Sequence, residues 1–360
     1  MWYKESFFKY MTGFILVLLT IFLLGQVSFV LTPIKNALMV VALPLVITLL
    51  FYYLLRPIVR LLVKHGLSKI LSILVCFIGT IGLLILLVIL AGNTINNEFN
   101  QLVNELPRVL TVAEDTLTNL INSGNLDFLS TDNSIEKLSN FIEKTVPVLS
   151  EGIFSGISTA ISTVTALLLV PFILFYFLKD DKIFARSTIN LFPGKYKDEA
   201  RDILVDIDNT LSSYITGQAL ICLAIGVLMY IGYLIIGLKY ALVLALFSMF
   251  TAVVPFVGPI VGVVPALLIG LSYNSLVIIK ILIIMVLVQQ LEGTLITPQI
   301  MGKRIHTHPI MIIIVLLISA SLFGFVGILL AIPSYAVLKV FIKNGIKTYK
   351  IIRREKKTTA

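Results

Sequence analysis

The chain has 360 residues, of which 58% are hydrophobic and 13% are charged. Soluble domains average roughly half and a quarter, so this composition excludes a disordered chain, a disulfide scaffold and a coiled coil, and it argues against a soluble enzyme. The net charge of +9 would suggest nucleic-acid binding in a soluble protein. Here the basic residues cluster beside apolar runs, which is typical of membrane spans that meet the cytoplasm, so an integral membrane protein that binds no nucleic acid is predicted.

Five segments are long and apolar enough to cross a lipid bilayer as helices, which takes about 20 residues. They are roughly 11–31, 37–55, 70–91, 153–178 and 210–236. The uncharged run that opens the first segment is longer than the apolar core of a signal peptide, so we interpret it as a retained span.

Charge asymmetry between the loops predicts the orientation. The segment 56–69 and the tail 341–360 are strongly basic, whereas the insert 92–152 carries nine acids and three basic residues. Basic loops are retained inside the cell. We therefore expect both termini and the segment 56–69 in the cytoplasm, and the insert outside.

The insert carries apolar residues at helical spacing over 99–121 and again over 135–146, separated by a turn signal at 122–125. Two amphipathic helices are expected. They could pack on each other or on a neighbouring subunit of a homo-oligomer, or they could receive a ligand. On the opposite side, residues 179–208 form the main cytoplasmic loop, with an amphipathic helix that begins at Lys195 and continues into the fifth span.

The C-terminal third contains interrupted apolar segments. A single helix over 240–272 would be about 50 Å long, too long for a bilayer core of roughly 30 Å. Proline breaks helices, so two short arms joined by an elbow are predicted. Unusual backbone conformations and a close approach of the backbone are expected at the elbow glycines. The elbow residues are Pro255, Gly258, Pro259 and Gly262.

Residues 310–322 and 325–340 repeat this design around an elbow at 324–327, with Pro333 interrupting the second arm. An ordinary span, 276–297, lies between the two hairpins. The basic residues Lys303 and Arg304 require a cytoplasmic loop after that span, which fits two re-entrant hairpins that enter from opposite faces. Two complete crossings per hairpin in a thin region are the alternative.

Two polar side chains within apolar segments are functional candidates. Glu292 lies in the span 276–297, where an acid is costly, and it either takes part in function or reaches water and pairs with Lys303 or Arg304. Gln218 lies in the fifth span and needs partners, so it either joins helices or contacts a ligand. His306 and His308 have no Cys or carboxylate pattern to complete a metal site, and no metal or cofactor is predicted.

Several short motifs occur in a specific order along the chain. In that order they resemble the autoinducer-2 exporter (AI-2E) family of bacterial permeases over nearly the whole length. Phe256 departs from the tyrosine that the family often has, so a hydroxyl contact there is not carried over. The motifs are FYFLKD at 175–180, YITGQ at 214–218, PFVGP at 255–259, Gln290 with Glu292, TPQIMG at 297–302, His308-Pro309, and Gly324 and Gly327 with Pro333.

The sequence thus predicts an all-α polytopic membrane protein of about eight membrane segments, with two re-entrant hairpins and a small extracellular helical insert. It divides into N-terminal helices (1–91), the insert (92–152), a transport core (153–340) and a basic tail (341–360).

The resemblance implies a transporter of the bacterial plasma membrane, not an enzyme, that exports a small polar solute, autoinducer-2. A sodium (cation)/proton antiporter and a non-transporting scaffold are the alternatives. The residues expected to contact the solute or ion are Gln218, Pro255, Gly258, Pro259, Gln290, Glu292, Thr297, Pro298, Gly324 and Gly327.

Overall fold

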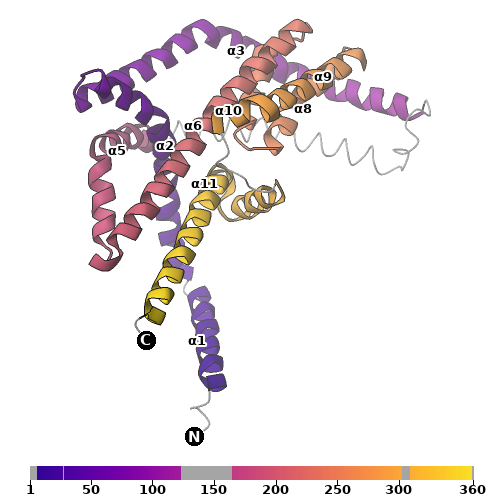
Figure 1. The fold of residues 1–360 in the computed structure, drawn as a ribbon. Coiled ribbons are helices and arrows are strands. Elements are labelled where there is room, and N and C mark those ends of the chain that lie inside the picture. Colours follow the sequence, from indigo (N-terminus) through magenta and orange to yellow (C-terminus); the bar gives the residue numbers. More distant parts are fainter. Residues whose placement is uncertain (1–5, 27, 123–163, 274, 302–308, 359–360) are drawn as a thin grey trace.

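The computed structural model describes residues 6–26, 28–122, 164–273, 275–301 and 309–358, and every element in these ranges is a helix (Figure 1). Four helical segments within them are long and apolar enough to cross a membrane, and they are accompanied by shorter apolar helices. The protein is therefore an all-α polytopic membrane protein. The four long segments are Pro44–Lys64, Lys69–Glu105, Lys197–Ile235 and Leu276–Met301.

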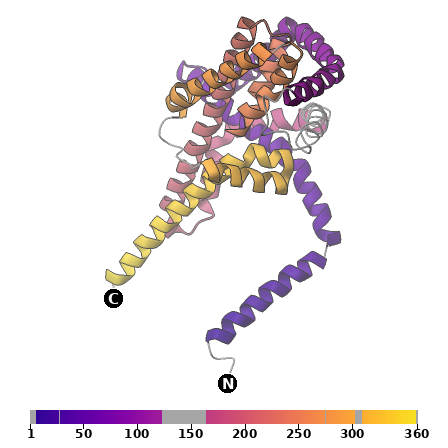
Figure 2. The same ribbon diagram turned by 90° about the vertical axis from the view of Figure 1, so that its right-hand side faces the viewer.

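Three helices form the N-terminal part. α1 (Ser6–Gln26) projects away from the body of the molecule in both views (Figures 1 and 2). α2 (Ser28–Lys64) continues through Arg56, so the basic residues expected in a loop lie on the last turns of a helix. α3 (Lys69–Asn122) has 54 residues and is about 80 Å long. It passes the expected boundary at residue 91 without interruption, because the helical pattern of the insert continues that of the span.

The central part contains α5 (Val164–Asn190), a short 3₁₀ turn, η3 (Gly194–Tyr196), and α6 (Lys197–Ile235). The expected cytoplasmic loop is therefore mostly helical, with a departure from helical geometry at Asp180 (φ −111°, ψ 23°). α6 continues from its amphipathic start into the fifth span, as expected. The second helix of the insert and the first part of the fourth span lie outside the described residues.

The first hairpin consists of α7 (Ala241–Thr251) and α8 (Val257–Leu271), joined by an elbow at residues 252–256. With 11 and 15 residues, these arms measure about 16 and 22 Å. The expected break at Gly258, Pro259 and Gly262 is wrong, since all three residues lie inside α8. Pro259 is tolerated because it occupies the first turn, where backbone N–H groups have no helical partner.

The next span is α9 (Ser275–Leu291), followed without a gap by a π-helical turn, η4 (Glu292–Ile296), and by α10 (Thr297–Met301). The loop with Lys303, Arg304, His306 and His308 lies outside the described residues.

The second hairpin is formed by α11 (Pro309–Thr358), which folds back on itself at Gly324 (φ 58°, ψ −137°). Its two arms lie side by side in Figure 2. The expectation that Pro333 interrupts the second arm is wrong, because the helix continues through it.

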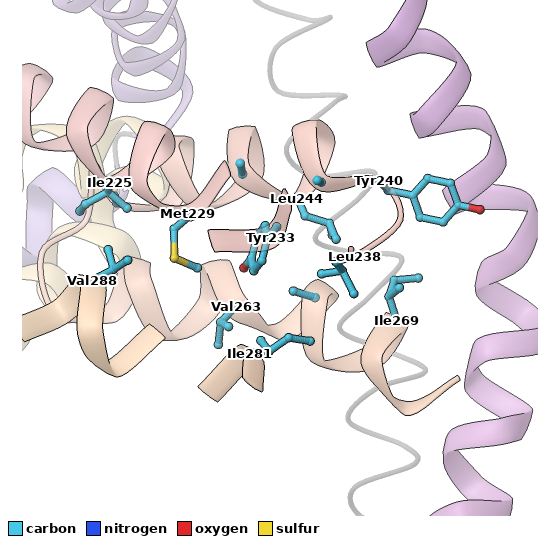
Figure 3. Close-up of a cluster of buried hydrophobic side chains, with 14 of the residues drawn as sticks. Ile225, Met229, Tyr233, Leu238, Tyr240, Leu244, Val263, Ile269, Ile281 and Val288 are labelled. Carbon is cyan, nitrogen blue, oxygen red and sulfur yellow. The ribbon is translucent and has the colours of Figure 1, made fainter. Parts of the chain in front are cut away.

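Two clusters of buried apolar side chains share α6. Cluster 1 joins the second half of α6 to α7, α8 and α9 (Figure 3), and includes Tyr233, Leu244, Val263 and Ile281. Cluster 2 joins Tyr214 and Ile215 of α6 to α2, α5 and α11, and includes Tyr52, Leu174, Leu316 and Ala331. α6 is therefore the helix against which both hairpins pack.

Glycines on α6 allow neighbouring helices to approach closely. A methyl group at Gly226 would lie 2.8 Å from Cβ of Met249 on α7. One at Gly232 would lie 2.5 Å from Cγ2 of Ile284 on α9. Small residues at such contacts are typical of helix packing in membranes, where van der Waals contact rather than the hydrophobic effect drives association.

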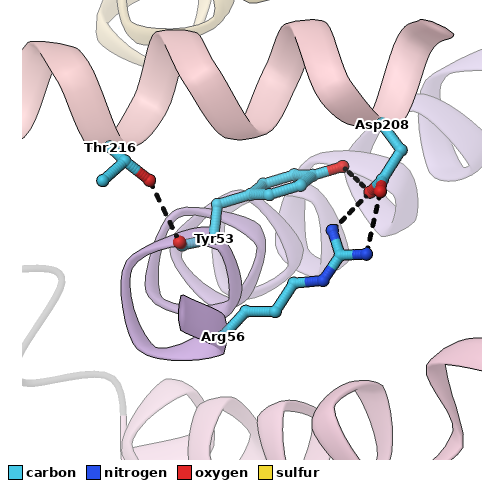
Figure 4. A network of polar contacts seen from close by, with 4 residues as sticks. All are labelled: Tyr53, Arg56, Asp208 and Thr216. Carbon is cyan, nitrogen blue, oxygen red and sulfur yellow. Dashed lines mark hydrogen bonds and ion pairs between the residues drawn. The ribbon is translucent and has the colours of Figure 1, made fainter. Parts of the chain in front are cut away.

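A polar network joins α2 to α6 (Figure 4). The Arg56 guanidinium donates two hydrogen bonds to the Asp208 carboxylate, at 2.6 and 2.8 Å, and the Tyr53 hydroxyl donates a third at 3.2 Å. The Thr216 hydroxyl donates to the backbone carbonyl of Tyr53 at 3.2 Å. The Arg56 side chain is 12% exposed and the Asp208 side chain is 37% exposed, so water screens this ion pair only in part.

We expect removal of either charge to destabilise the protein. Arg56→Ala leaves a half-buried carboxylate without its partner, and should lower the free energy of unfolding by about 2 kcal/mol, between the values for surface and for fully buried pairs. The measurement is thermal unfolding in detergent, with the exposed Arg60→Ala as control. The exchange Arg56→Asp with Asp208→Arg should recover part of the loss; equal stability of Arg56→Ala and wild type would contradict the role given to this pair.

Candidate functional site

The elbow of the first hairpin is a tight and strained turn. The backbone N–H of Val257 donates to the carbonyl of Pro255 at 2.8 Å, and Phe256 between them has φ 66° and ψ −45°. This is the γ-turn in which the central residue has a positive φ, a rare conformation for any residue with a side chain. Such strain persists only where the surroundings enforce it, and it concentrates at functional sites. The Phe256 side chain itself is exposed.

The two arms below this turn are in direct backbone contact. A Cβ atom on Gly258 would overlap the carbonyl oxygen of Thr251 and lie 2.5 Å from its carbonyl carbon. One turn further, the Ser248 hydroxyl donates to the carbonyl of Gly262 at 3.0 Å. Small residues recur every four positions along this face of α8, at Gly258, Gly262, Ala266 and Gly270.

The expectation that Gly258 needs an unusual backbone conformation is wrong: Gly258 lies in the first turn of α8, and the positive φ is at Phe256. Glycine is required at 258 because of the close approach of Thr251.

Gln218 of α6 binds the elbow through a side-chain hydrogen bond. Its side-chain amide donates to the carbonyl of Ala252 at 2.8 Å, and the residue is 8% exposed. Ala252 follows the last residue of α7, where carbonyl groups lack helical partners. Gln218 therefore joins helices, as one of the two sequence interpretations proposed, and it does so at the elbow.

Glu292 is the first residue of the π-turn η4. It is partly buried and accepts a hydrogen bond from the side-chain amide of Gln289 at 3.2 Å. In the same turn the Thr294 hydroxyl donates to the carbonyl of Gln290 at 2.5 Å. A π-turn contains an extra residue relative to an α-helix, and such turns are frequent at functional sites.

The elbow and the π-turn segment meet α6 over the same stretch. Gln218 binds the elbow, and Gly226 receives Met249 from the end of α7. From the other side, Ile300 and Met301 of α10 pack on Gly217, and residues of the π-turn η4 also contact α6. Residues 217–226 of α6 therefore connect two irregular backbone segments in an apolar region, and we take this as the candidate functional site.

Only some of the predicted site residues lie at the candidate site. Gln218, Pro255, Gly258, Pro259 and Glu292 belong to the elements that meet at this stretch of α6, and Thr297 begins α10 beside it. Gln290 and Pro298 are exposed.

Gly324 and Gly327 lie on the second hairpin, which packs in cluster 2 through Ile312, Leu316, Ala331 and Ile332. Its elbow shares two features with the first, a residue with positive φ and a glycine that closely approaches a backbone carbonyl. The positive φ is at Gly324, five residues after Ser319, and a Cβ atom on Gly327 would overlap the Ser319 carbonyl oxygen. Gly327 is therefore also required for close approach rather than for its φ angle.

Sequence reasoning missed Ser248 and Thr251, the hydroxyl residues that bind backbone carbonyls within the first hairpin. The sequence does indicate them, because they are polar residues in a long uncharged run. In the structure they lie opposite the glycines of α8. The π-turn had no comparable signal, because the same residues fit a regular helix.

Nearly the whole chain matches a known family. A model of the AI-2E family transporter matches residues 8–347. The chain belongs to the AI-2E transporter family. The expected resemblance is confirmed, and the protein is a multi-pass membrane transporter.

Relatives of known sequence extend over almost the same length. YueF, a candidate transport protein of Bacillus subtilis, is 36% identical over 350 residues, which cover 94% of each chain. YrrI, a candidate transport protein of the same organism, is 30% identical over 326 residues, 91% of this chain and 92% of its own. PerM, a candidate permease of Escherichia coli, is 23% identical over 309 residues, 83% and 86% of the two chains.

Larger side chains at Gly258 and Gly327, next to the two elbows, should abolish transport by this AI-2E family protein. We expect Gly258→Ala and Gly327→Ala to cost about 1–3 kcal/mol through overpacking, and the leucine variants to abolish transport while the protein still inserts. The measurement is flux normalised to folded protein. Gly82→Leu is the matched control, because Gly82 lies in a helix with open space around it. Normal flux in both elbow leucine variants would show that the close contacts do not matter.

Proposed function

We propose that this AI-2E family protein is a secondary transporter that exports a small polar solute, with autoinducer-2 as the substrate. The observation that carries the proposal is the pair of irregular backbone segments, elbow and π-turn, that meet α6 within an apolar protein. Irregular backbone is tolerated at membrane depth only where protein buries it or where water reaches it. Interrupted helices are a recurring means by which transporters bind solutes near the middle of the bilayer.

The chemistry of these segments suits a neutral, hydroxyl-rich solute. The elbow offers backbone carbonyl groups, since a carbonyl oxygen can accept a second hydrogen bond, whereas the N–H groups of Val254, Val257 and Gly258 already bind backbone carbonyls. The end of α9 and the π-turn add the side chains of Gln289, Gln290 and Glu292. Such groups both donate and accept hydrogen bonds. The exposed ring of Phe256 adds an apolar surface at the tip of the hairpin, against which carbon atoms of the solute can pack.

A cation/proton antiporter is the second candidate, and Glu292 is the observation that favours it. An acid inside an apolar candidate span (Leu276–Met301) is a default candidate for ion or proton exchange. In this alternative the Glu292 carboxylate alternates between a proton and a cation.

We further propose the orientation with both termini in the cytoplasm. Support comes from polar contacts that join segments expected on the same side of the membrane. Lys69 binds Asp181 at 2.8 Å, and Asn344 of α11 binds Asp206 at 3.0 Å. Both contacts join expected cytoplasmic segments. Glu98 in the expected outer insert binds Val243, at the start of the first hairpin.

Cysteine labelling tests this orientation. In a background without Cys76 and Cys222, single cysteines at positions 190 and 303 should react only from the cytoplasm, and one at 100 only from outside. Cysteines at 257 and 325, at the two elbows, should react with small aqueous thiol reagents although they lie at mid-depth. Labelling of position 303 from outside would contradict the two re-entrant hairpins, since the loop would then follow an odd number of crossings.

Flux in proteoliposomes distinguishes the two functions. An exporter should move autoinducer-2 in wild type and in Glu292→Gln, with altered affinity in the variant, because glutamine preserves the shape and most hydrogen bonds. An antiporter should exchange radioactive sodium for protons, and Glu292→Gln should reduce that exchange and its pH dependence to the level of empty liposomes. The measurement is flux per folded molecule across a pH series.

Wild-type protein that moves neither autoinducer-2 nor sodium would contradict both functions. If Glu292 is only structural, the variant will instead lower the amount of folded protein while flux per folded molecule stays normal.

A further inference from the structure

The first hairpin begins at a helix end that lacks a local cap. Tyr240, which precedes α7, has a left-handed backbone conformation (φ 60°, ψ 28°), and its side chain makes no capping hydrogen bond. The first N–H groups of a helix have no partner within the helix. Burying such groups without partners is costly, so a partner has to come from elsewhere in the protein.

The partner comes from α3, some 145 residues away in sequence. The Glu98 carboxylate accepts a hydrogen bond from the backbone N–H of Val243, the third residue of α7, at 3.1 Å. This is the N–H that a capping side chain normally binds. A carboxylate there also interacts favourably with the positive end of the helix dipole.

α3 also packs against α7 beyond this hydrogen bond. Leu102 is buried in cluster 1, to which Tyr240 and Ala241 also belong. Figure 3 shows the Tyr240 side chain directed toward α3. Glu98 and Leu102 are spaced by four residues, so they share one face of the helix.

We infer that Glu98 is a positioning residue for transport: it supplies, as a hydrogen-bond acceptor, the missing cap of α7 and so fixes the depth of the first hairpin. This inference rests on the proposed transport function of the elbow. α7 is a single short helix between Glu98 at one end and the elbow at the other. A shift at its start therefore displaces the strained turn at Phe256 and the contact between Ala252 and Gln218.

The same contact couples the insert to the candidate site. α3 is continuous from the expected third span into the insert, so displacement of the outer part of α3 is transmitted through Glu98 to the elbow. If Glu98 positions the elbow, its removal must move the elbow in protein that remains folded. If Glu98 serves folding alone, its removal lowers only the amount of folded protein.

The test measures the rate of thiol labelling at the elbow and the rate of transport in the same variants. In protein without Cys76 and Cys222, a cysteine at position 257 reports the exposure of the elbow to an aqueous thiol reagent. We expect Glu98→Ala to change the labelling rate at 257 about fivefold, the factor that loss of one capping hydrogen bond implies. Autoinducer-2 flux per folded molecule should fall by a similar factor.

Glu98→Gln retains an acceptor oxygen and should behave as wild type. Asn100→Ala, an exposed position on the opposite side of the same helix, is the control for a change in α3 away from the hairpin. If Glu98→Ala does not fold, Glu98→Asp, whose shorter side chain cannot reach Val243 in the same way, takes its place.

Identical labelling rates at 257 in all variants overturn the inference. A loss in Glu98→Gln as large as that in Glu98→Ala also overturns it, because the acceptor would then not be what matters. The labelling result stands whether or not autoinducer-2 is the substrate. If wild type moves no autoinducer-2 but the label responds to Glu98, the proposed function fails and the positioning role is retained.

Discussion

Close packing against α6 is the contact on which the rest of the structure depends. In a membrane, helices gain little from burying apolar surface, because the lipid is as apolar as the protein. Association therefore needs short interhelical distances, and the glycines of α6 provide them by admitting Met249 and Ile284. Through these contacts α6 holds α7 and α9 in cluster 1. Tyr214 and Ile215 of the same helix join the second hairpin in cluster 2.

The hairpins contain helix ends that lie inside an apolar region. Every backbone polar group there needs a partner. At the first elbow the γ-turn pairs Pro255 with Val257, and Gln218 takes up the carbonyl of Ala252. At the start of α7 the partner is Glu98. The strain at Phe256 is maintained by these contacts, so elbow geometry and helix packing are parts of the same arrangement.

Much of this fold could be predicted from the sequence because the determining signals are local. Uncharged runs gave the helices, and the elbow at Gly324 was located correctly from its glycines. Helix interruption was less predictable, since proline is disruptive in a helix interior but harmless in the first turn. Pro259 and Gly262 were therefore assigned to the elbow when they belong to α8.

The candidate site was only partly accessible to such reasoning. Gln218 and Glu292 were found because polar residues in apolar runs are conspicuous. The partner of Gln218 was not found, because the Ala252 carbonyl is a backbone group of a kind that every residue possesses. The contact between Glu98 and the Val243 N–H was missed for the same reason. The pairing of Arg56 with Asp208 joins residues 152 positions apart, and no periodicity in one sequence reports such a distance.

The glycines of this protein differ in what lies opposite them, and this difference has an evolutionary consequence. Gly226 and Gly232 face the side chains of Met249 and Ile284. A larger residue on α6 can therefore be accommodated by a smaller one on the facing helix, and these positions are free to change in pairs. Gly258 and Gly327 face backbone carbonyls, which no substitution in the partner removes. Among homologues the first kind of glycine should covary with its neighbour, whereas the second kind should remain fixed.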